Sequence, residues 1–359
     1  MAFWKHLQQE PLDAILVAFP LAFLAYLLNW GEVSIFILSA LGIIPLARYI
    51  GVATEALAAY TGPRLGGLLN ATLGNAAELI IAIVAIREGL LELVKASITG
   101  SILGNVLLVL GFSIFLGGLR HGVQTFDRQQ ASSNAILLAL AVVALLIPSL
   151  LSNAIGPQTS VRVEAFSLGV AGIMIALYAL GIIFSFRTQA APVSPPIPEE
   201  AEEHTAWSIR TALLILAGAT AGVAALSELL VGAVEPVVAH LGVSEFFLGI
   251  ILIPIVGNIA EHLVAVKVAL ENKMDLSVEI SIASSLQIAL FVAPVLVFIS
   301  LLMGNPLQLI FNQFELLALA AGVLIAALVS SDGESNWLEG AELLAVYLIL
   351  GLAFYLLPA

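Results

Sequence analysis

The chain lacks cysteine and is poor in charge. None of its 359 residues is cysteine, which excludes disulfides, thiolate metal sites and cysteine nucleophiles. Only 10% of the residues are charged, and 12 lysines and arginines stand against 25 acids, for a net charge of −13. A nucleic-acid partner would need a basic face that this composition does not supply, so cations are the expected ligands.

Hydrophobic residues, in contrast, make up 61% of the chain. Apolar runs near 20 residues recur along its length, and about 20 residues cross a ~30 Å hydrocarbon core as a helix. Strands of a β-barrel alternate in short segments instead. The sequence therefore predicts an all-α integral membrane protein. Leu12 to Leu28 is expected to remain as its first membrane helix, because no cleavage signature follows it.

Apolar runs and the breakers between them predict about eleven transmembrane helices. They are expected at 11–29, 32–49, 54–87, 92–119, 131–152, 163–186, 208–234, 243–270, 274–303, 310–330 and 338–357. The third, fourth, eighth and ninth are long and rich in glycine, so we expect breaks or strong tilt in them.

The central segment 187–207 combines prolines with an acidic cluster, Glu199, Glu200, Glu202 and Glu203. It is interpreted as a linker between two halves, either a plain solvated spacer or a regulatory, cation-sensing segment.

Lysine and arginine predict the orientation, since cytoplasmic loops retain positive charge. On the side of the N-terminus we place Lys5, Arg48, Arg120, Arg128, Arg187, Arg210, Lys267 and Lys273, against Arg87, Lys95 and Arg162 opposite. The N-terminus and the acidic linker should be cytoplasmic and the C-terminus on the opposite side.

A Gly-Asn-x-Ala-Glu pentapeptide occurs twice, as GNAAE at 74–78 and GNIAE at 257–261. An offset of 183 residues aligns the two copies and gives eight identities over positions 74–101, including Ser101 with Ser284. Shared Asn, Glu and Ser do not follow from shared hydrophobicity. The pattern therefore indicates an internal repeat.

The repeat divides the chain into an N-terminal peripheral helix (1–30), a first five-helix repeat (31–186), the linker (187–207) and a second five-helix repeat (208–359). An odd number of helices per unit makes the two units enter the membrane from opposite faces. This inverted-repeat arrangement is typical of secondary transporters, whose substrate site lies near the midplane.

Each pentapeptide places an Asn and a Glu on one helix face: Asn75 with Glu78, and Asn258 with Glu261. A carboxylate inside a membrane costs at least ~2.5 kcal/mol and needs a proton, a partner or a cation. A buried packing pair satisfied by the asparagines is the alternative interpretation. Because the whole surroundings are duplicated, we expect a metal site at the midplane.

Oxygen ligands of this kind suit Ca²⁺, while the lack of Cys and the single adjacent His262 disfavour zinc and copper. When the ion leaves, two close carboxylates in an apolar setting should take up protons. The ion and the protons then compete for one pair of groups, which predicts exchange of about two protons per Ca²⁺. No cofactor is expected.

Other polar residues have weaker roles in this scheme. Ser101, Ser284 and Gln287 are candidate accessory ligands, although Ser also serves as packing glue between membrane helices. His262 is a candidate proton relay or a neutral, satisfied His. Glu228 and Glu235 lie on one helix face and either line an approach path for cations or mark a helix end.

The stretches GNAAELI at 74–80, PIVGNIAEH at 254–262 and GSILGNVLLVLG at 100–111 resemble the calcium/proton exchanger (CAX) family of the calcium/cation antiporter superfamily. Further stretches at 272–294 and 332–340 agree. The resemblance implies alternating access, with Glu78 and Glu261 binding Ca²⁺ or protons, and Ser101, Ser284 and Gln287 as accessory ligands. It also implies the inner (plasma) membrane of a bacterial-type cell, with lipid as surroundings.

The leading hypothesis is thus a Ca²⁺/H⁺ antiporter, not an enzyme. A sodium-driven calcium exchanger would share the architecture. An intramembrane metal-dependent enzyme would account for paired acids but not for an inverted repeat, and a channel would bind a divalent ion too tightly to conduct fast. The sequence allows a homo-oligomer without requiring one.

Overall fold

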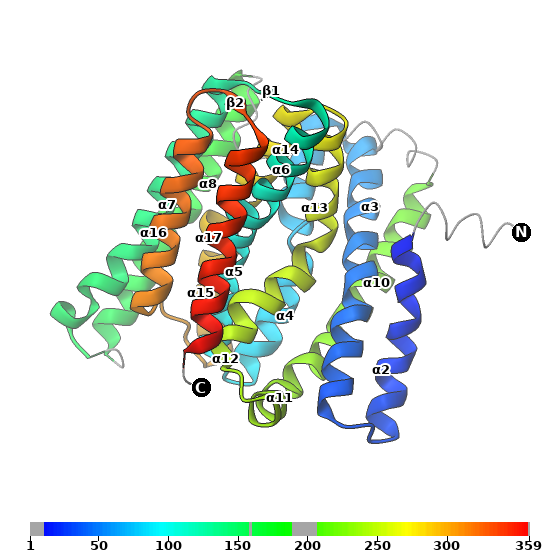
Figure 1. Ribbon diagram of the computed structural model, residues 1–359. Coiled ribbons are helices and arrows are strands. Elements are labelled where there is room, and N and C mark those ends of the chain that lie inside the picture. The colour runs from blue at the N-terminus through cyan, green and yellow to red at the C-terminus, as the bar shows by residue number, and fades with distance from the viewer. Residues whose placement is uncertain (1–10, 158–159, 189–206, 358–359) are drawn as a thin grey trace, which may run out of the picture.

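The structure is a computed structural model that describes residues 11–157, 160–188 and 207–357. Its described part is a bundle of helices that run mostly side by side along one direction (Figure 1). Eight helical segments are long and apolar enough to cross a membrane: 32–61, 91–121, 128–155, 161–184, 209–232, 245–270, 274–303 and 337–356. Two shorter apolar helices, at 12–27 and 313–329, accompany them.

The first half of the chain contributes ten elements. They are η1 (Pro11–Val17), α2 (Ala18–Leu27), α3 (Glu32–Leu73), α4 (Ala76–Arg87), α5 (Leu91–Leu103), η2 (Gly104–Val109), α6 (Leu110–His121), β1 (Gln124–Thr125), α7 (Arg128–Ile155) and α8 (Val161–Thr188).

The second half follows the part of the central segment that lies outside the described residues. Its elements are α10 (Ile209–Gly232), α11 (Val234–Leu241), α12 (Glu245–Phe247), η3 (Leu248–Leu252), α13 (Ile253–Leu270), α14 (Met274–Gln287), η4 (Ile288–Val292), α15 (Ala293–Met303), α16 (Gln313–Val329), β2 (Glu334–Ser335) and α17 (Trp337–Leu356).

Helix α3 turns back on itself. A Cβ added at Gly66 would lie 2.9 Å from the Cβ of Ala58, yet a straight helix separates residues eight apart by about 12 Å. The sequence between them contains Gly62 and Pro63, residue types that weaken or break helices. The membrane span within α3 accordingly ends at Thr61.

The second and third expected helices, 32–49 and 54–87, therefore have the wrong boundaries. A single glycine, Gly51, costs a helix only about 1 kcal/mol, and α3 continues through it. The reversal comes later, near Gly62. The expected 54–87 helix is also interrupted at Gly74 and Asn75, after which α4 begins.

Two long spans contain π-helical turns at related places. Span 91–121 contains η2, and span 274–303 contains η4. The 183-residue offset of the repeat maps η2 onto residues 287–292, and η4 occupies 288–292 of this range. Such turns widen the helix locally and are frequent at functional sites. Both spans therefore contain a segment that is not regular α-helix.

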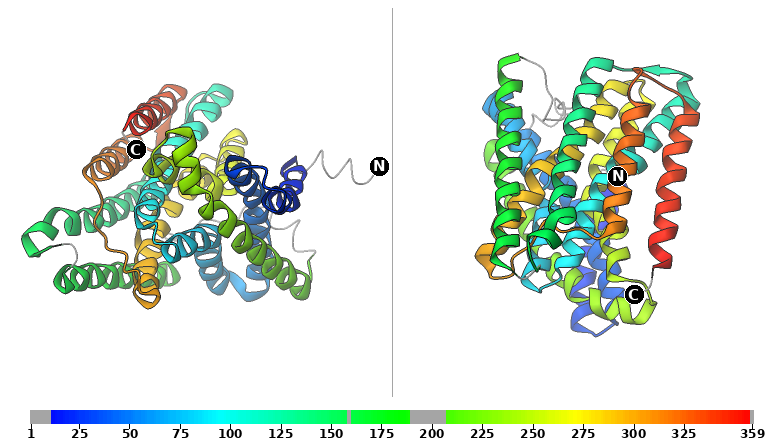
Figure 2. Two further views of the ribbon diagram at one scale, coloured as in Figure 1. Left: turned by 90° about the horizontal axis from the view of Figure 1, so that it is seen from below. Right: turned by 90° about the vertical axis from the view of Figure 1, so that its left-hand side faces the viewer.

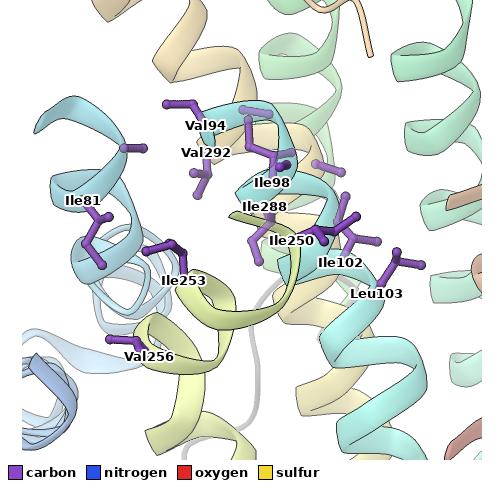
Figure 3. Close-up of a cluster of buried hydrophobic side chains, with 14 of the residues drawn as sticks. Ile81, Val94, Ile98, Ile102, Leu103, Ile250, Ile253, Val256, Ile288 and Val292 are labelled. Atoms are coloured by element: carbon purple, nitrogen blue, oxygen red, sulfur yellow. The ribbon is translucent and has the colours of Figure 1, made fainter. Parts of the chain in front are cut away.

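The helices fall into two groups around a shared centre. Helix α2 packs on α3 and α3 on α10 at one side, while α7, α8 and α16 lie at the other, as the end-on view shows (Figure 2). Between them, α4, α5, η3, α13 and η4 meet in a core of Ile, Leu and Val side chains that includes Ile81, Ile102 and Ile253 (Figure 3).

A two-stranded antiparallel sheet of β1 and β2, here called the β1–β2 clip, joins the two halves at one end of the bundle. Strand β1 pairs antiparallel with β2, with Gln124 opposite Ser335. The Gln124 amide also donates to the backbone carbonyl of Ala269 at 3.0 Å. The loops before α7, α14 and α17 are thereby held together at the same end (Figure 1).

Close packing of α5 against η3 leads to a stability prediction. A Cβ added at Gly100 would clash with the Ile250 carbonyl oxygen, which is backbone and cannot move aside. We expect Gly100→Ala to destabilise the protein by about 1–3 kcal/mol, as overpacking does. Thermal unfolding in detergent measures this, with Gly104→Ala as control because nothing lies within 4 Å of a Cβ there. Equal melting temperatures for the two variants would contradict the packing.

Candidate cation site

Glu78 lies in the first turn of α4, directly after the interruption at Gly74 and Asn75. The N-terminus of a helix presents unpaired N–H groups and a partial positive charge, both of which stabilise a carboxylate. Asn75 is the N-cap residue of α4 and is 1% exposed. The break in the helix thus places Glu78 inside the bundle at a helix start.

Glu261 lies within α13, where the helix continues through Gly257 and Asn258. The Ser284 hydroxyl on α14 donates to a Glu261 carboxylate oxygen at 2.7 Å. This hydrogen bond joins two candidate ligands, Ser284 and Glu261, that lie on neighbouring helices.

The glycine of each pentapeptide packs against the glutamate of the other. A Cβ added at Gly257 would lie 3.0 Å from Cγ of Glu78, and one added at Gly74 would lie 3.4 Å from Oε1 of Glu261. The absence of a side chain at each glycine thus leaves space for the glutamate side chain of the other pentapeptide. The two carboxylates are close enough for Glu261 to act electrostatically on Glu78.

The Glu78 carboxylate is poorly satisfied by the described residues. Both of its oxygens are buried, and within the described part of the chain neither has a hydrogen-bond partner at ordinary geometry. The Asn258 side chain lies near enough to interact with it. A buried carboxylate in this situation needs a proton or a cation to offset its desolvation.

The asparagine of each pentapeptide forms a hydrogen bond with a residue from the other half of the chain. The Asn75 amide donates to Oε1 of Gln287 at 2.7 Å, and the Asn258 amide donates to the Ser101 hydroxyl at 3.2 Å. Ser101 and Gln287 are almost completely buried. The seven candidate metal-site residues therefore form one polar cluster around the two carboxylates.

His262 points to a different partner. Its Nε2 lies 3.1 Å from Oδ1 of Asn105, and both residues are buried. Sequence reasoning missed Asn105, although it belongs to the 100–111 stretch that carries the family resemblance. It lies in η2, where the π-helical turn alters the facing of side chains, so its contact could not be read from helical spacing.

The other predicted site residues lie away from the cluster. Glu228 forms an ion pair with Arg87, which also pairs with Glu88 at 2.9 Å, and all three are exposed. Glu235 lies in the first turn of the short helix α11, Val234–Leu241. Glu199, Glu200, Glu202 and Glu203 lie outside the described residues.

The cluster offers two carboxylates with neutral oxygens around them. Among the described residues, no group of three or more His, Asp or Glu is gathered as for a resident metal. Hard cations with oxygen ligands fit two carboxylates that balance a double charge. The arrangement can hold a divalent ion or protons at the same groups.

Comparison with known proteins identifies the class. Residues 32–187 and 211–356 match the sodium/calcium exchanger protein family, and the chain belongs to this family. The predicted resemblance to calcium/proton exchangers is confirmed by curated relatives over nearly the whole chain.

The chain is 47% identical to a Ca²⁺/H⁺ antiporter of Aphanothece halophytica, over 96% of each chain. It is 48% identical to a Ca²⁺/H⁺ antiporter of Synechocystis sp., again over 96% of each. A solved structure of native YfkE superposes with a TM-score of 0.84 at 41% identity, and the match covers 96% of this chain and 100% of that one.

The packing of Gly257 on Glu78 gives a functional prediction. Gly257→Ala forces the Glu78 side chain to shift by a few tenths of an ångström, and small displacements of reacting groups are costly. We expect the rate of proton-driven Ca²⁺ uptake into sealed vesicles to fall about tenfold or more. Gly51→Ala is the control, because nothing lies within 4 Å of a Cβ there. Unchanged uptake by Gly257→Ala would show that Glu78 need not hold this position.

Proposed function

We propose that this protein is a secondary antiporter that exchanges Ca²⁺ for H⁺ across a membrane. The observation that carries the proposal is the reciprocal packing of the two pentapeptides, which puts Glu78 and Glu261 beside each other's glycine in the bundle interior. One pair of carboxylates can neutralise one Ca²⁺ or hold two protons.

Competition for this pair supplies the coupling. Bound Ca²⁺ offsets both negative charges, and its release leaves two close carboxylates in an apolar interior, a state that favours proton uptake. Each ion then crosses only when the other has left. Charge balance within the pair corresponds to about two protons per Ca²⁺.

The relatives support protons rather than sodium as the driving ion. Those at 47% and 48% identity are named Ca²⁺/H⁺ antiporters. The alternative, a sodium-driven exchanger, shares the family, and the vesicle experiment below separates the two.

We further propose that the chain crosses the membrane eleven times, as a peripheral first helix and two inverted five-helix repeats. The matched positions of η2 and η4 and the reciprocal glycines support the repeat. Alternating access then follows from movement of one group of helices against the other around a fixed site. The excess of Lys and Arg supports a cytoplasmic N-terminus and linker in an inner membrane.

Asn75, Asn258, Ser101, Ser284 and Gln287 complete the proposed site. Their buried hydrogen bonds across the two halves hold amide and hydroxyl oxygens next to the carboxylates. Neutral oxygens of this kind fill the coordination sphere of Ca²⁺ without adding charge.

Charge-neutral substitution of either glutamate tests the proposal. In vesicles with an imposed pH gradient and no Na⁺, the native protein should take up Ca²⁺, and a protonophore should stop the uptake. Glu78→Gln and Glu261→Gln should each abolish it, because one carboxylate cannot balance a divalent ion. Glu88→Gln, at the exposed end of the same α4, should transport normally.

Two results would reject the proposal. Ca²⁺ movement that requires a Na⁺ gradient would assign the protein to sodium-driven exchange. Equal Ca²⁺ uptake by the native protein and both glutamine variants would show that Glu78 and Glu261 are not part of the transport site.

A pair of neighbouring serines tests the accessory ligands. Ser284 donates to Glu261, whereas Ser285 donates to the Ser281 carbonyl of its own helix at 3.0 Å. A hydrogen bond to a charged group contributes about 1.5–3 kcal/mol, so Ser284→Ala should weaken apparent Ca²⁺ affinity about tenfold or more. Ser285→Ala should leave the affinity near the native value. Equal affinities for both variants in a transport titration would argue against Ser284 as part of the site.

A further inference from the structure

Helices α7 and α14 begin side by side at the end of the bundle that carries the β1–β2 clip. The backbone N–H of Asp127 donates to the Asp275 carboxylate in the first turn of α14. The Asp127 side chain caps α7 by accepting from the backbone N–H of Gln129 at 2.8 Å. From this contact the two helices run in the same direction and pack together.

The helix starts account for Asp127 and Asp275, since acidic residues stabilise the first turn of a helix. They do not account for two oxygens that lie deeper in the two helices. Oε1 of Glu279 and Oδ1 of Asn134 are both buried, and neither has a hydrogen-bond partner among the described residues. Asn134 is 1% exposed.

These two oxygens belong to facing surfaces of the two helices. Gln130 of α7 lies close enough to Glu279 for the two side chains to interact, so this face of α7 is turned to α14. Asn134 follows Gln130 by four residues and so lies on the same face. Side chains lean toward the N-terminus of their helix, which directs Asn134 back toward the level of Glu279.

The repeat does not preserve the acidic side chain of Glu279. The 183-residue offset pairs Glu279 with Ala96 and Asn134 with Leu317. Ala96 is fully buried and packs closely on Gly249. The position that corresponds to Glu279 in the other half thus carries an apolar side chain, whereas Leu317 is exposed and is no guide to a buried position.

The nearest basic residues along the chain are engaged elsewhere. Lys273 lies 3.4 Å from Glu271, and Arg128 donates to the Ser331 carbonyl at 2.8 Å. Glu279 makes no ion pair within the described part of the chain. A carboxylate with a buried, unpartnered oxygen then lacks the positive charge that would offset its desolvation.

We propose that Glu279, Asp275, Asn134 and Gln130 form a second cation site between α7 and α14. Two carboxylates and amide oxygens are hard ligands whose charge balances a divalent ion, and Ca²⁺ is the ion of this class that accepts such irregular oxygen sets. The site is distinct from the Glu78–Glu261 pair. Five residues of helix turn by about 140°, so Glu279 faces away from the side on which Ser284 meets Glu261.

A cation at this site ties α14 to α7. Helix α14 also carries Ser284 and Gln287, which contact the central pair through Glu261 and Asn75. Occupancy of the second site therefore fixes the helix that supplies two accessory ligands to the first. This inference does not depend on the proposed exchange activity, because binding is measured without transport.

The test uses the full chain with Glu78→Gln and Glu261→Gln, which removes the charge of the central pair. Equilibrium dialysis against radioactive Ca²⁺ in detergent should show one remaining Ca²⁺ site. Adding Glu279→Gln, or separately Asn134→Leu, should weaken this binding at least about tenfold, because carboxylate and amide ligands set the affinity of such sites. Glu271→Gln, an exposed carboxylate at the same end, should leave it unchanged.

The experiment has clear contrary results. The site is overturned if the double variant binds no Ca²⁺, or if binding persists unchanged after Glu279→Gln. Persistence after Glu279→Gln would assign the residual binding to other acids, such as the 187–207 linker. Melting temperatures of all variants, measured in parallel, identify any loss of binding that comes from unfolding. Glu279→Gln and Asn134→Leu test the site independently, so unfolding of one variant still leaves the other as a test.

Discussion

Two carboxylates buried side by side among membrane helices are the constraint on which the rest of this structure depends. Neither Glu78 nor Glu261 is stable there as an isolated charge, so each needs a charge partner and a local backbone that tolerates it. The interruption before α4 gives Glu78 a helix start. The two signature glycines leave space for the opposite carboxylates, and the close approach of Gly100 to Ile250 brings the two halves together nearby.

The two halves are related but not equivalent. Glu261 accepts a hydrogen bond from Ser284, whereas the Glu78 oxygens have no partner at ordinary geometry among the described residues. Asn258 bonds Ser101, but Asn75 bonds Gln287 rather than Ser284, the serine that matches Ser101. Helix α4 starts just before Glu78, while α13 runs through its own signature. The two carboxylates therefore have different surroundings.

Much of this site could be predicted from the sequence, because a duplicated Asn-x-x-Glu in an apolar chain must bury two carboxylates that only protons, a partner or a cation can stabilise. Membrane spans were predictable because length and hydropathy decide them. The expected end of the second helix at residue 49 comes too early, because a lone Gly51 does not break a helix and α3 continues through it. The Asn105–His262 contact and the unpartnered oxygens of Glu279 and Asn134 could not be predicted, because they depend on π-helical turns and on which helices pack together.

The central claim is that Ca²⁺ and protons share Glu78 and Glu261. It is tested most directly by counting protons released when Ca²⁺ binds to the purified native protein, by calorimetry in buffers of different ionisation enthalpy. At a pH at which the empty site is protonated, the account predicts release of about two protons per Ca²⁺ at the central site, in line with its charge balance. The release should disappear when both glutamates are replaced by glutamine. Ca²⁺ binding at this site without proton release would contradict the account.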